Sequence, residues 1–317
     1  MEFLGGLFNS LVDNYADYEY FVATAQLFLA MLGMGALLAP RDFLLEMKRP
    51  QGLLMGLGMQ WLLVPLVAFV LGLLLPVPAG IGIGLVLIAV VPGGTLSNIL
   101  TLFGRGNIAL SVSLTSITTV AALITTPLLL GFLADQYLPD DFRMPAGRIA
   151  LDILVALIIP LLIGMLVHYR LSGAFAARFS KITIRVSLLL IVFMTIGAGG
   201  SGRLDPQTYG PWALVGLFLF CIGIQLVALV AGLLARLRAA DITAIVIEGG
   251  FRNISLAVAV KATVFPARPG ELDPIGDAAL FVLLLYGGVS LLMCLIPVFL
   301  NRRISAARDG SRAGTAD

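Results

Sequence analysis

Oxygen-bearing side chains stand beside helix-breaking residues at two places within long apolar stretches of this chain. The first is 92–98 (PGGTLSN) and the second is 248–253 (EGGFRN). Carboxylate, hydroxyl and amide oxygens are the ligands that hard cations such as sodium prefer. A carboxylate within an apolar segment is costly unless it is paired or functional, so Glu248 makes the second cluster a candidate ion site.

Both clusters contain residues that interrupt a helix. Pro92 has no N–H and its ring clashes with the preceding turn, while Gly93 and Gly94 permit a change of direction. Backbone that leaves the helix inside a bilayer must be buried in protein or line a cavity, because each unpaired group costs several kcal/mol. Two such breaks in separate halves of a chain are typical of a transporter's central site. The alternative is a kinked helix whose small polar residues pack against its neighbours.

The stretch after the first cluster adds two more hydroxyls. Ser111 and Thr115 are four residues apart, so they share one face of a helix. With the two clusters they complete a set of candidate ligands: Ser97, Asn98, Ser111, Thr115 and Glu248.

Three other polar residues fall within apolar segments. Arg252 follows Glu248 by four residues, and we expect the two charges to pair. Gln60 by itself indicates a hydrogen bond between helices. Lys261 lies about 20 Å beyond Glu248 along a helix, so we expect it to snorkel to the outer surface. The sequence shows no Ser/His/Asp or metal-hydrolase pattern, which argues against an enzyme.

The composition is that of a membrane protein. Of 317 residues, 59% are apolar and 12% are charged, whereas a soluble domain has about 25% charge. The mean hydropathy is +1.03. Nine segments are long enough to cross a bilayer, so the predicted fold is all-α and polytopic. These segments are 21–39, 52–75, 80–103, 107–134, 147–168, 183–199, 210–235, 241–264 and 277–300.

Basic residues in short loops predict the orientation. With residues 1–20 outside, most of the 20 Lys and Arg fall on the inner side, and the C-terminus is then cytoplasmic. We therefore expect an outside-facing segment 1–20, a transmembrane domain 21–300 in the cell (inner) membrane, and a disordered cytoplasmic tail 301–317. The basic residues act as topological signals, so the net charge of +2 does not indicate nucleic-acid binding.

The stretch 90–119 (VVPGGTLSNILTLFGRGNIALSVSLTSITT) resembles the bile acid:sodium symporter family in its nine-helix form. The segment 247–253 (IEGGFRN) and the spacing from Gln60 to Pro65 support the resemblance, which extends over about 21–300. It implies an inverted-repeat fold in which spans 1, 5 and 6 form a panel and spans 2–4 and 7–9 form a core. Spans 3 and 8 would be discontinuous and would cross.

The resemblance also implies roles for particular residues. The first sodium site would consist of Ser97, Asn98, Ser111, Thr115 and Glu248. A second site would use Glu248, Gln60 and the carbonyls of Gly249 and Phe251, but Arg252 stands where the family has a glutamine. A guanidinium has no acceptor atom and is always charged, so it would repel sodium and could take its place.

The organic-anion pocket implied by the resemblance corresponds to the neighbourhood of Thr95 and Asn253. Arg252 could alternatively hold a substrate carboxylate there. The predicted function is sodium-coupled symport of a small organic anion, with at most one sodium ion, by alternating access. A proton-coupled or uncoupled carrier, with Glu248 as the proton site, and an anion-binding receptor without transport are the alternatives.

Overall fold

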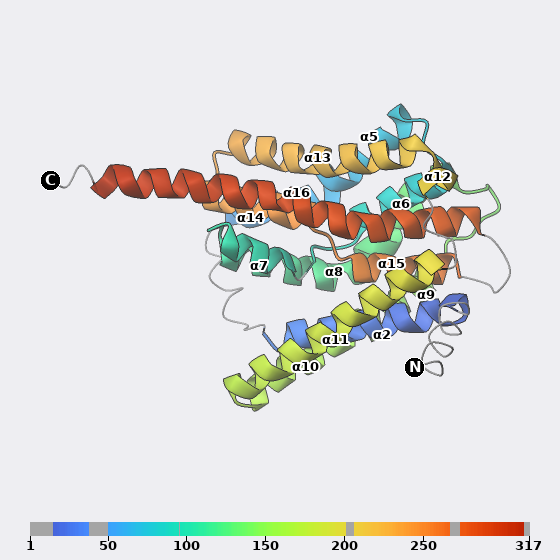
Figure 1. Ribbon diagram of the computed structural model, residues 1–317, viewed down its shortest axis with the longest axis horizontal. Coiled ribbons are helices and arrows are strands. Elements are labelled where there is room, and N and C mark those ends of the chain that lie inside the picture. Colours follow the sequence, from blue (N-terminus) through green and yellow to red (C-terminus); the bar gives the residue numbers. More distant parts are fainter. Residues whose placement is uncertain (1–14, 38–49, 95, 201–205, 267–272, 314–317) are drawn as a thin grey trace.

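The computed structural model describes residues 15–37, 50–94, 96–200, 206–266 and 273–313. Within these residues all nine predicted spans are helical, and the only β-structure is an isolated antiparallel bridge between Gly93 and Arg252. The protein is an all-α polytopic membrane protein whose helices run side by side (Figure 1).

Seven of the spans are helical throughout, two of them with a π-helical turn inside. They are α2 (Tyr15–Gly35), α4–η1–α5 (Pro50–Gly58, Met59–Leu63, Val64–Leu74), α8–η2 (Ile108–Ala134, Asp135–Tyr137), α9–η3–α10 (Ala146–Ile153, Leu154–Ile158, Ile159–Arg170), α11 (Gly173–Gly200), α13 (Pro211–Leu234) and α16 (Pro274–Ala313). A short helix, α12 (Pro206–Tyr209), precedes α13.

The other two spans are broken in the middle, as the sequence predicts. The third consists of α6 (Ala79–Val90) and α7 (Leu96–Phe103), and the eighth of α14 (Ala239–Gly250) and α15 (Ile254–Val264). Each half is too short to cross a bilayer by itself, since a spanning helix needs about 20 residues.

Both ends of the helical part differ from the prediction. Helix α2 begins at Tyr15, ahead of the predicted start of the first span, and α16 continues to Ala313, where a disordered tail was expected. Residues after Asn301 include several alanines and arginines, which are good helix formers and extend a helix that is already nucleated. The far end of α16 projects beyond the other helices (Figure 1).

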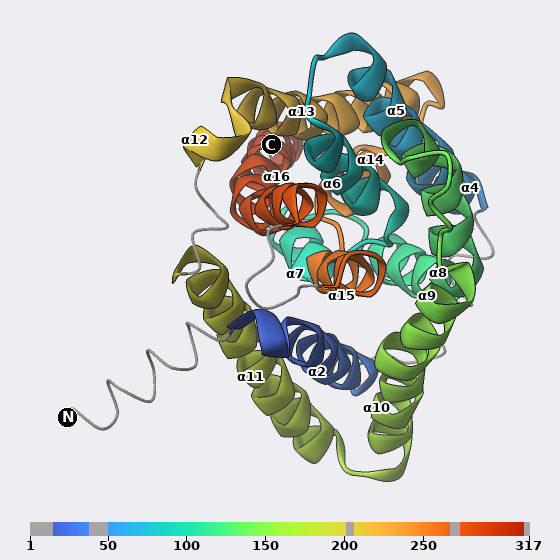
Figure 2. The same cartoon turned by 90° about the vertical axis from the view of Figure 1, so that its right-hand side faces the viewer.

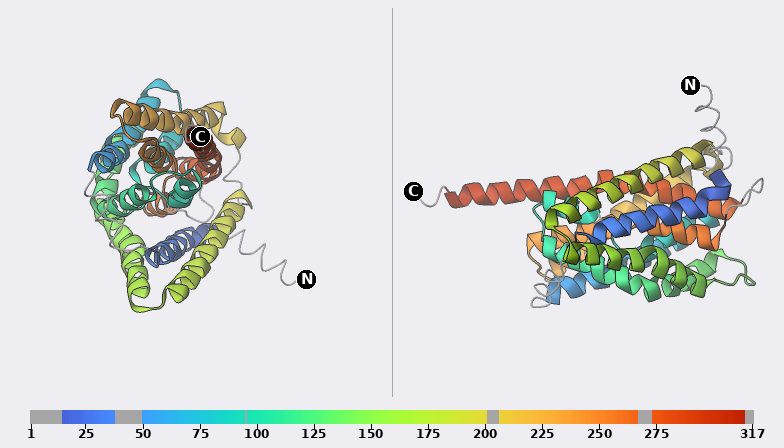
Figure 3. Two further views of the ribbon diagram at one scale, coloured as in Figure 1. Left: turned by 90° about the vertical axis from the view of Figure 1, so that its left-hand side faces the viewer. Right: turned by 90° about the horizontal axis from the view of Figure 1, so that it is seen from below.

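The first, fifth and sixth spans form a group on one side of the bundle. Figure 2 shows α2, α10 and α11 beneath the remaining helices. Helix α2 packs on α10 so closely that a Cβ at Gly35 would lie 2.1 Å from the Leu161 carbonyl oxygen. Outside this group, α2 packs mainly on α15. The start of α2 and the end of α16 lie at opposite ends of the bundle (Figure 3).

Helix α6 forms the centre of the other group. Every residue from Gly80 to Val90 is buried, and small residues allow α16 to approach. A Cβ at Gly80 would lie 2.6 Å from the Ile275 carbonyl oxygen, and one at Gly84 would lie 2.8 Å from the Val282 Cβ. Close approach at small residues is how membrane helices gain packing energy, so α6 and its broken end are held firmly in place.

Candidate ion site at the helix crossing

The two helix breaks meet and pair with each other. The Gly94 N–H donates to the Phe251 carbonyl and the Asn253 N–H donates to the Pro92 carbonyl, each with a distance of 2.8 Å. Backbone groups that left their helices therefore find partners in the other break, which satisfies the requirement for unwound backbone at membrane depth.

Hydroxyl groups from neighbouring spans cap the helix ends at the crossing. Thr126 Oγ1 in α8 donates to the Val90 carbonyl of α6 at 3.0 Å, and Tyr286 OH in α16 donates to the Gly250 carbonyl of α14 at 2.8 Å. Each cap comes from the span that follows the broken one. The sequence pattern does not indicate that Thr126 and Tyr286 act as caps, although a buried hydroxyl in an apolar helix needs a partner.

The five predicted ligands of the first ion site lie together beside the crossing. Glu248 Oε2 accepts hydrogen bonds from Ser97 Oγ at 2.5 Å and Ser111 Oγ at 3.0 Å, and Oε1 accepts one from Thr115 Oγ1 at 2.5 Å. Asn98 Oδ1 lies 2.8 Å from Ser111 Oγ and 3.4 Å from Thr115 Oγ1. Spans 3, 4 and 8 each contribute, and the carboxylate is 1% exposed.

This cluster has the donor chemistry of a hard-cation site. Each of its five side chains presents an oxygen lone pair, and the group contains one full negative charge to offset the ion's charge. The described residues contain no cluster of histidine, cysteine and acidic side chains that would suit a transition metal. The all-oxygen donor set around Glu248 would suit a hard cation such as an alkali ion.

Arg252 does not pair with Glu248, contrary to the expectation from their spacing. Its Nε and Nη2 donate to the carbonyls of Ile88 at 3.3 Å and Ala89 at 3.1 Å, and Nη2 also donates to the Val91 carbonyl. Among the residues that the structure describes, no ion pair joins the two charges. The reason is the break itself: Arg252 lies beyond the end of α14, where the i,i+4 relation of a helix no longer holds.

The guanidinium thus caps the C-terminal end of α6. The last carbonyls of a helix lack intrahelical partners and carry partial negative charge, which a cation stabilises. Arg252 is 2% exposed, and all four of its hydrogen bonds are to buried acceptors.

Gln60 connects this cap to the other break. The π-helical turn η1 contains Gln60, whose Oε1 accepts from Arg252 Nη1 at 2.9 Å and from the Gly93 N–H at 3.1 Å. The Phe251 carbonyl accepts from Gly94, and Gly249 lies in the last turn of α14 against Met59. Two of the predicted second-site oxygens, those of Gln60 and Phe251, are therefore engaged by protein donors.

Of the residues predicted to contact an anion, Asn253 contacts α2 and Thr95 is not described. Asn253 is the N-cap of α15, where its side chain accepts from the Leu256 N–H, and its Nδ2 lies 3.9 Å from Met31 Sδ of α2. It therefore stands at the boundary between the two helix groups. Thr95 lies outside the described residues.

Lys261 is not at the surface, and the expectation that it snorkels is wrong. Its Nζ lies 2.8 Å from Glu19 Oε1, and both side chains are 1% exposed. Glu19 belongs to the first turns of α2, ahead of residue 21, where the first span was predicted to start.

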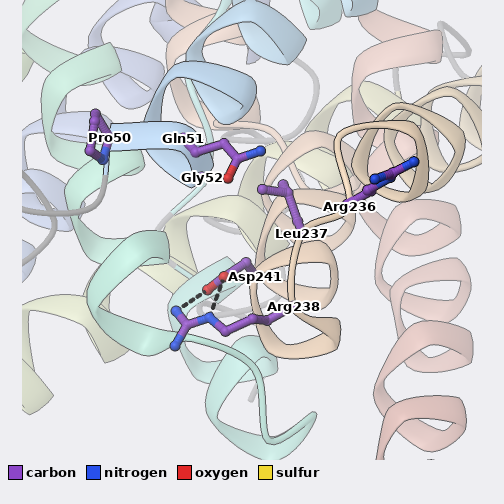
Figure 4. A pocket seen from close by; sticks show the side chains of 7 residues that line it. All are labelled: Pro50, Gln51, Gly52, Arg236, Leu237, Arg238 and Asp241. Atoms are coloured by element: carbon purple, nitrogen blue, oxygen red, sulfur yellow. Dashed lines mark hydrogen bonds and ion pairs between the residues drawn. The ribbon is translucent and has the colours of Figure 1, made fainter.

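A pocket of about 350 Å³ lies away from the crossing, where α4 meets the turn between α13 and α14 (Figure 4). Arg238 and Asp241 form a two-pronged ion pair there at 2.7 and 2.8 Å, and Asn107 Nδ2 donates to the same carboxylate at 2.7 Å. These contacts fasten the loop before α8 to the start of α14. None of the candidate ion ligands lines this pocket.

Two broken spans that cross beside a cluster of oxygen-bearing side chains are the structural arrangement found in secondary transporters. The sequence defines the family within that class. Residues 24–201 match the Sodium Bile acid symporter family, and the chain belongs to it.

Individual relatives agree with this assignment. The chain is 37% identical over 155 residues to an uncharacterized sodium-dependent transporter, YocS, of Bacillus subtilis. The matched region covers 49% of this chain and 46% of the relative. It is 44% identical over 113 residues to the probable sodium/metabolite cotransporter BASS1 of Arabidopsis thaliana, covering 36% and 28%. It is 34% identical over 132 residues to a sodium-dependent organic anion transporter of the rat, covering 41% and 35%. The chain thus spans less than half of each relative.

Proposed function

We propose that this protein is a sodium-coupled symporter of a small organic anion, with a carboxylate as the expected charged group. The observation that carries the proposal is the convergence of five oxygen-bearing side chains from spans 3, 4 and 8 around Glu248. The names of the relatives, which are sodium-dependent transporters and an organic anion transporter, support both the ion and the substrate class.

Coupling follows from where the ligands lie. A sodium ion among these oxygens would bind three separate spans together and so fix the crossing. Helices α7 and α15 both begin at the crossing, and the N-terminal end of a helix carries partial positive charge that attracts an anion. An ion that stabilises this geometry raises the affinity for the anion, and the anion raises the affinity for sodium by the same factor.

Arg252 supports a stoichiometry of one sodium ion. Its guanidinium already supplies a positive charge at the end of α6 and engages the Gln60 oxygen that a second sodium ion would need. Contact with a substrate carboxylate would require the guanidinium to leave these carbonyls. With a monovalent anion and one sodium ion, each transport cycle moves no net charge.

Alternating access would come from motion between two bodies. In this proposal α2, α9–η3–α10 and α11 form the panel, the remaining spans form the core, and the anion binds between them near Asn253. The protein lies in the cell membrane with its N-terminus outside and its C-terminus in the cytoplasm.

The stoichiometry can be tested with purified protein in liposomes. Uptake of a monovalent anion by the native protein should follow the sodium and anion gradients and should not change when a membrane potential is imposed. A reversal potential that corresponds to two sodium ions per anion would refute the role of Arg252. The substitution Arg252→Gln removes the internal cation and offers an acceptor oxygen, so uptake should gain a second, cooperative dependence on sodium. Arg238→Gln, in the peripheral pocket, is the matched control and should keep the native dependence.

A proton-coupled carrier is the alternative. Glu248 accepts hydrogen bonds only from hydroxyls and forms no ion pair among the described residues, so a proton could neutralise it in place of sodium. Uptake that persists without sodium and follows an imposed pH gradient would favour this alternative.

A further inference from the structure

Two polar bridges join the panel to the core near one end of the molecule. The first is the ion pair between Glu19 in the first turns of α2 and Lys261 in the last turn of α15, at 2.8 Å. Figure 1 shows the start of α2 and the end of α15 at the same end of the bundle. Glu19 and Lys261 are 242 residues apart in the chain, so their meeting depends on how the two helix groups are docked.

The second bridge lies half a turn further along α15. Thr263 Oγ1 donates to Asp152 Oδ2 of α9 at 2.6 Å. The other oxygen of Asp152 accepts from Tyr20 OH of α2 at 3.0 Å and from Arg148 Nε at 3.2 Å. Helix α15 is therefore tied to both α2 and α9, which are parts of the panel.

A buried ion pair is a poor choice for an interface that stays closed. Removing two charges from water costs about as much as their attraction returns, and well-packed apolar residues of similar volume usually hold an interface equally well or better. The balance changes when the interface opens, because water then solvates both separated charges. A charged pair therefore allows an interface to be dry and paired in one state and wet and separated in another at similar free energy.

We propose that Glu19 and Lys261, with the Thr263–Asp152 bond beside them, form the gate that closes this end of the transport pathway. The inference rests on the proposed function, because a gate is needed only if panel and core separate during a transport cycle. The end in question is the outer one in the proposed orientation. The structure then represents the state in which this outer gate is closed.

Thiol labelling can report the opening of this gate without any transport. Ala23 lies one turn after Glu19 on the same face of α2 and is fully buried, so the substitution Ala23→Cys places a reporter just inside the pair. The native Cys221 and Cys294 are buried and free, and the protein without the new cysteine measures their background. The assay follows the rate of reaction with a water-soluble maleimide in detergent-purified protein, which makes the result independent of membrane orientation.

The pair predicts opposite effects for two variants in the Ala23→Cys background. Lys261→Met removes the positive charge that offsets Glu19 in the closed interface, so the open state should gain population and labelling should be at least about tenfold faster. The double variant Glu19→Met/Lys261→Met replaces the pair by apolar side chains, and labelling should be about tenfold slower than in the parent. Arg238→Met breaks an ion pair within a single span and should label at the parent rate.

Two results would overturn the gate. One is an unchanged labelling rate in both the single and the double variant. The other is fast labelling of the charge-exchanged variant Glu19→Lys/Lys261→Glu, which should return to the parent rate if the pair itself closes the gate. Size-exclusion chromatography checks that each protein is folded, and the double and exchanged variants keep the test valid if Lys261→Met does not fold.

The two proposals fail separately. If the expected labelling pattern is found but sodium-driven uptake is not, the gate is supported and the symport mechanism is wrong. If uptake depends on sodium but the labelling rate is the same in all variants of the pair, the symport mechanism stands and the gate is refuted.

Discussion

The Glu248 side chain is packed so tightly against position 93 that this residue must be glycine. A Cβ at Gly93 would lie 1.9 Å from Glu248 Oε1 and 2.7 Å from Cδ. Non-bonded carbon and oxygen atoms cannot approach so closely. Any side chain at position 93 must therefore push the Glu248 carboxylate away from its hydroxyl partners. Gly93 thus serves both the helix break and the geometry of the oxygen cluster.

The substitution Gly93→Ala should therefore remove sodium binding. Overpacking of this kind typically costs about 1–3 kcal/mol, and here the cost falls directly on the ion ligands. The measurement is the increase in melting temperature that sodium, but not potassium, produces in the purified protein. Gly288→Ala is the matched control, because nothing lies within 4 Å of a Cβ at that helical position. A sodium-induced shift that survives in Gly93→Ala would show that the ion does not bind at Glu248.

At the residue level the sequence predicts which polar side chains need a role, but spacing does not predict the partners of Arg252 and Lys261. The five candidate ligands are conspicuous because polar groups within apolar segments are costly unless they are paired or functional. Arg252 and Lys261 are equally conspicuous, but their partners are not predictable from spacing. Arg252 binds carbonyls 161 to 164 residues away, and a lysine near the end of a span has the same pattern whether it snorkels or pairs.

The broken helices are the elements on which the site depends. Proline and paired glycines predict the breaks, because these residues act on their own backbone. The hydroxyl caps from Thr126 and Tyr286 are not predictable in this way, since each depends on the packing of a second span. Sequence therefore indicates where a helix ends at this site, but not what stabilises its end.

Tyr286→Phe should weaken the crossing while leaving the shape of the side chain unchanged. It removes the hydroxyl that satisfies the Gly250 carbonyl in a fully buried place. A buried acceptor left without its donor costs about 1–3 kcal/mol. The expected result is a lower melting temperature together with a higher sodium concentration for half-maximal stabilisation. Tyr169→Phe, at an 82% exposed position, should change neither quantity, and an equal effect of both substitutions would contradict the role of the cap.

The whole molecule follows the pattern of its apolar segments closely. Among the described residues, six helices are long and apolar enough to cross a membrane, and the halves of the two broken spans supply shorter apolar helices, Ala79–Val90 and Ile254–Val264. The grouping of α2, α10 and α11 was expected only from the family resemblance. Hydropathy does not encode which helix packs on which, and close contacts such as Gly35 on α10 depend on shape.

Orientation is the property of the whole molecule that most needs a direct test. The distribution of Lys and Arg predicts a cytoplasmic C-terminus. A fluorescent protein fused after Asp317 should therefore fluoresce in bacterial cells, and alkaline phosphatase fused at the same point should be inactive. Phosphatase inserted after Pro139, in the loop that follows η2, should be active. The reverse pattern would invert the orientation and would assign the gate to the cytoplasmic side.

The pairing of the two breaks also has a consequence for how the chain is made. The Val91 carbonyl cannot form its hydrogen bond with Arg252 until the ribosome has synthesised another 161 residues. At about 5–20 residues per second this delay is roughly ten to thirty seconds. During that time the unwound backbone of the first break has already been delivered to the membrane without its partner. Biogenesis of this protein therefore requires that the insertion machinery, or water within it, shelter the first half until the second half arrives.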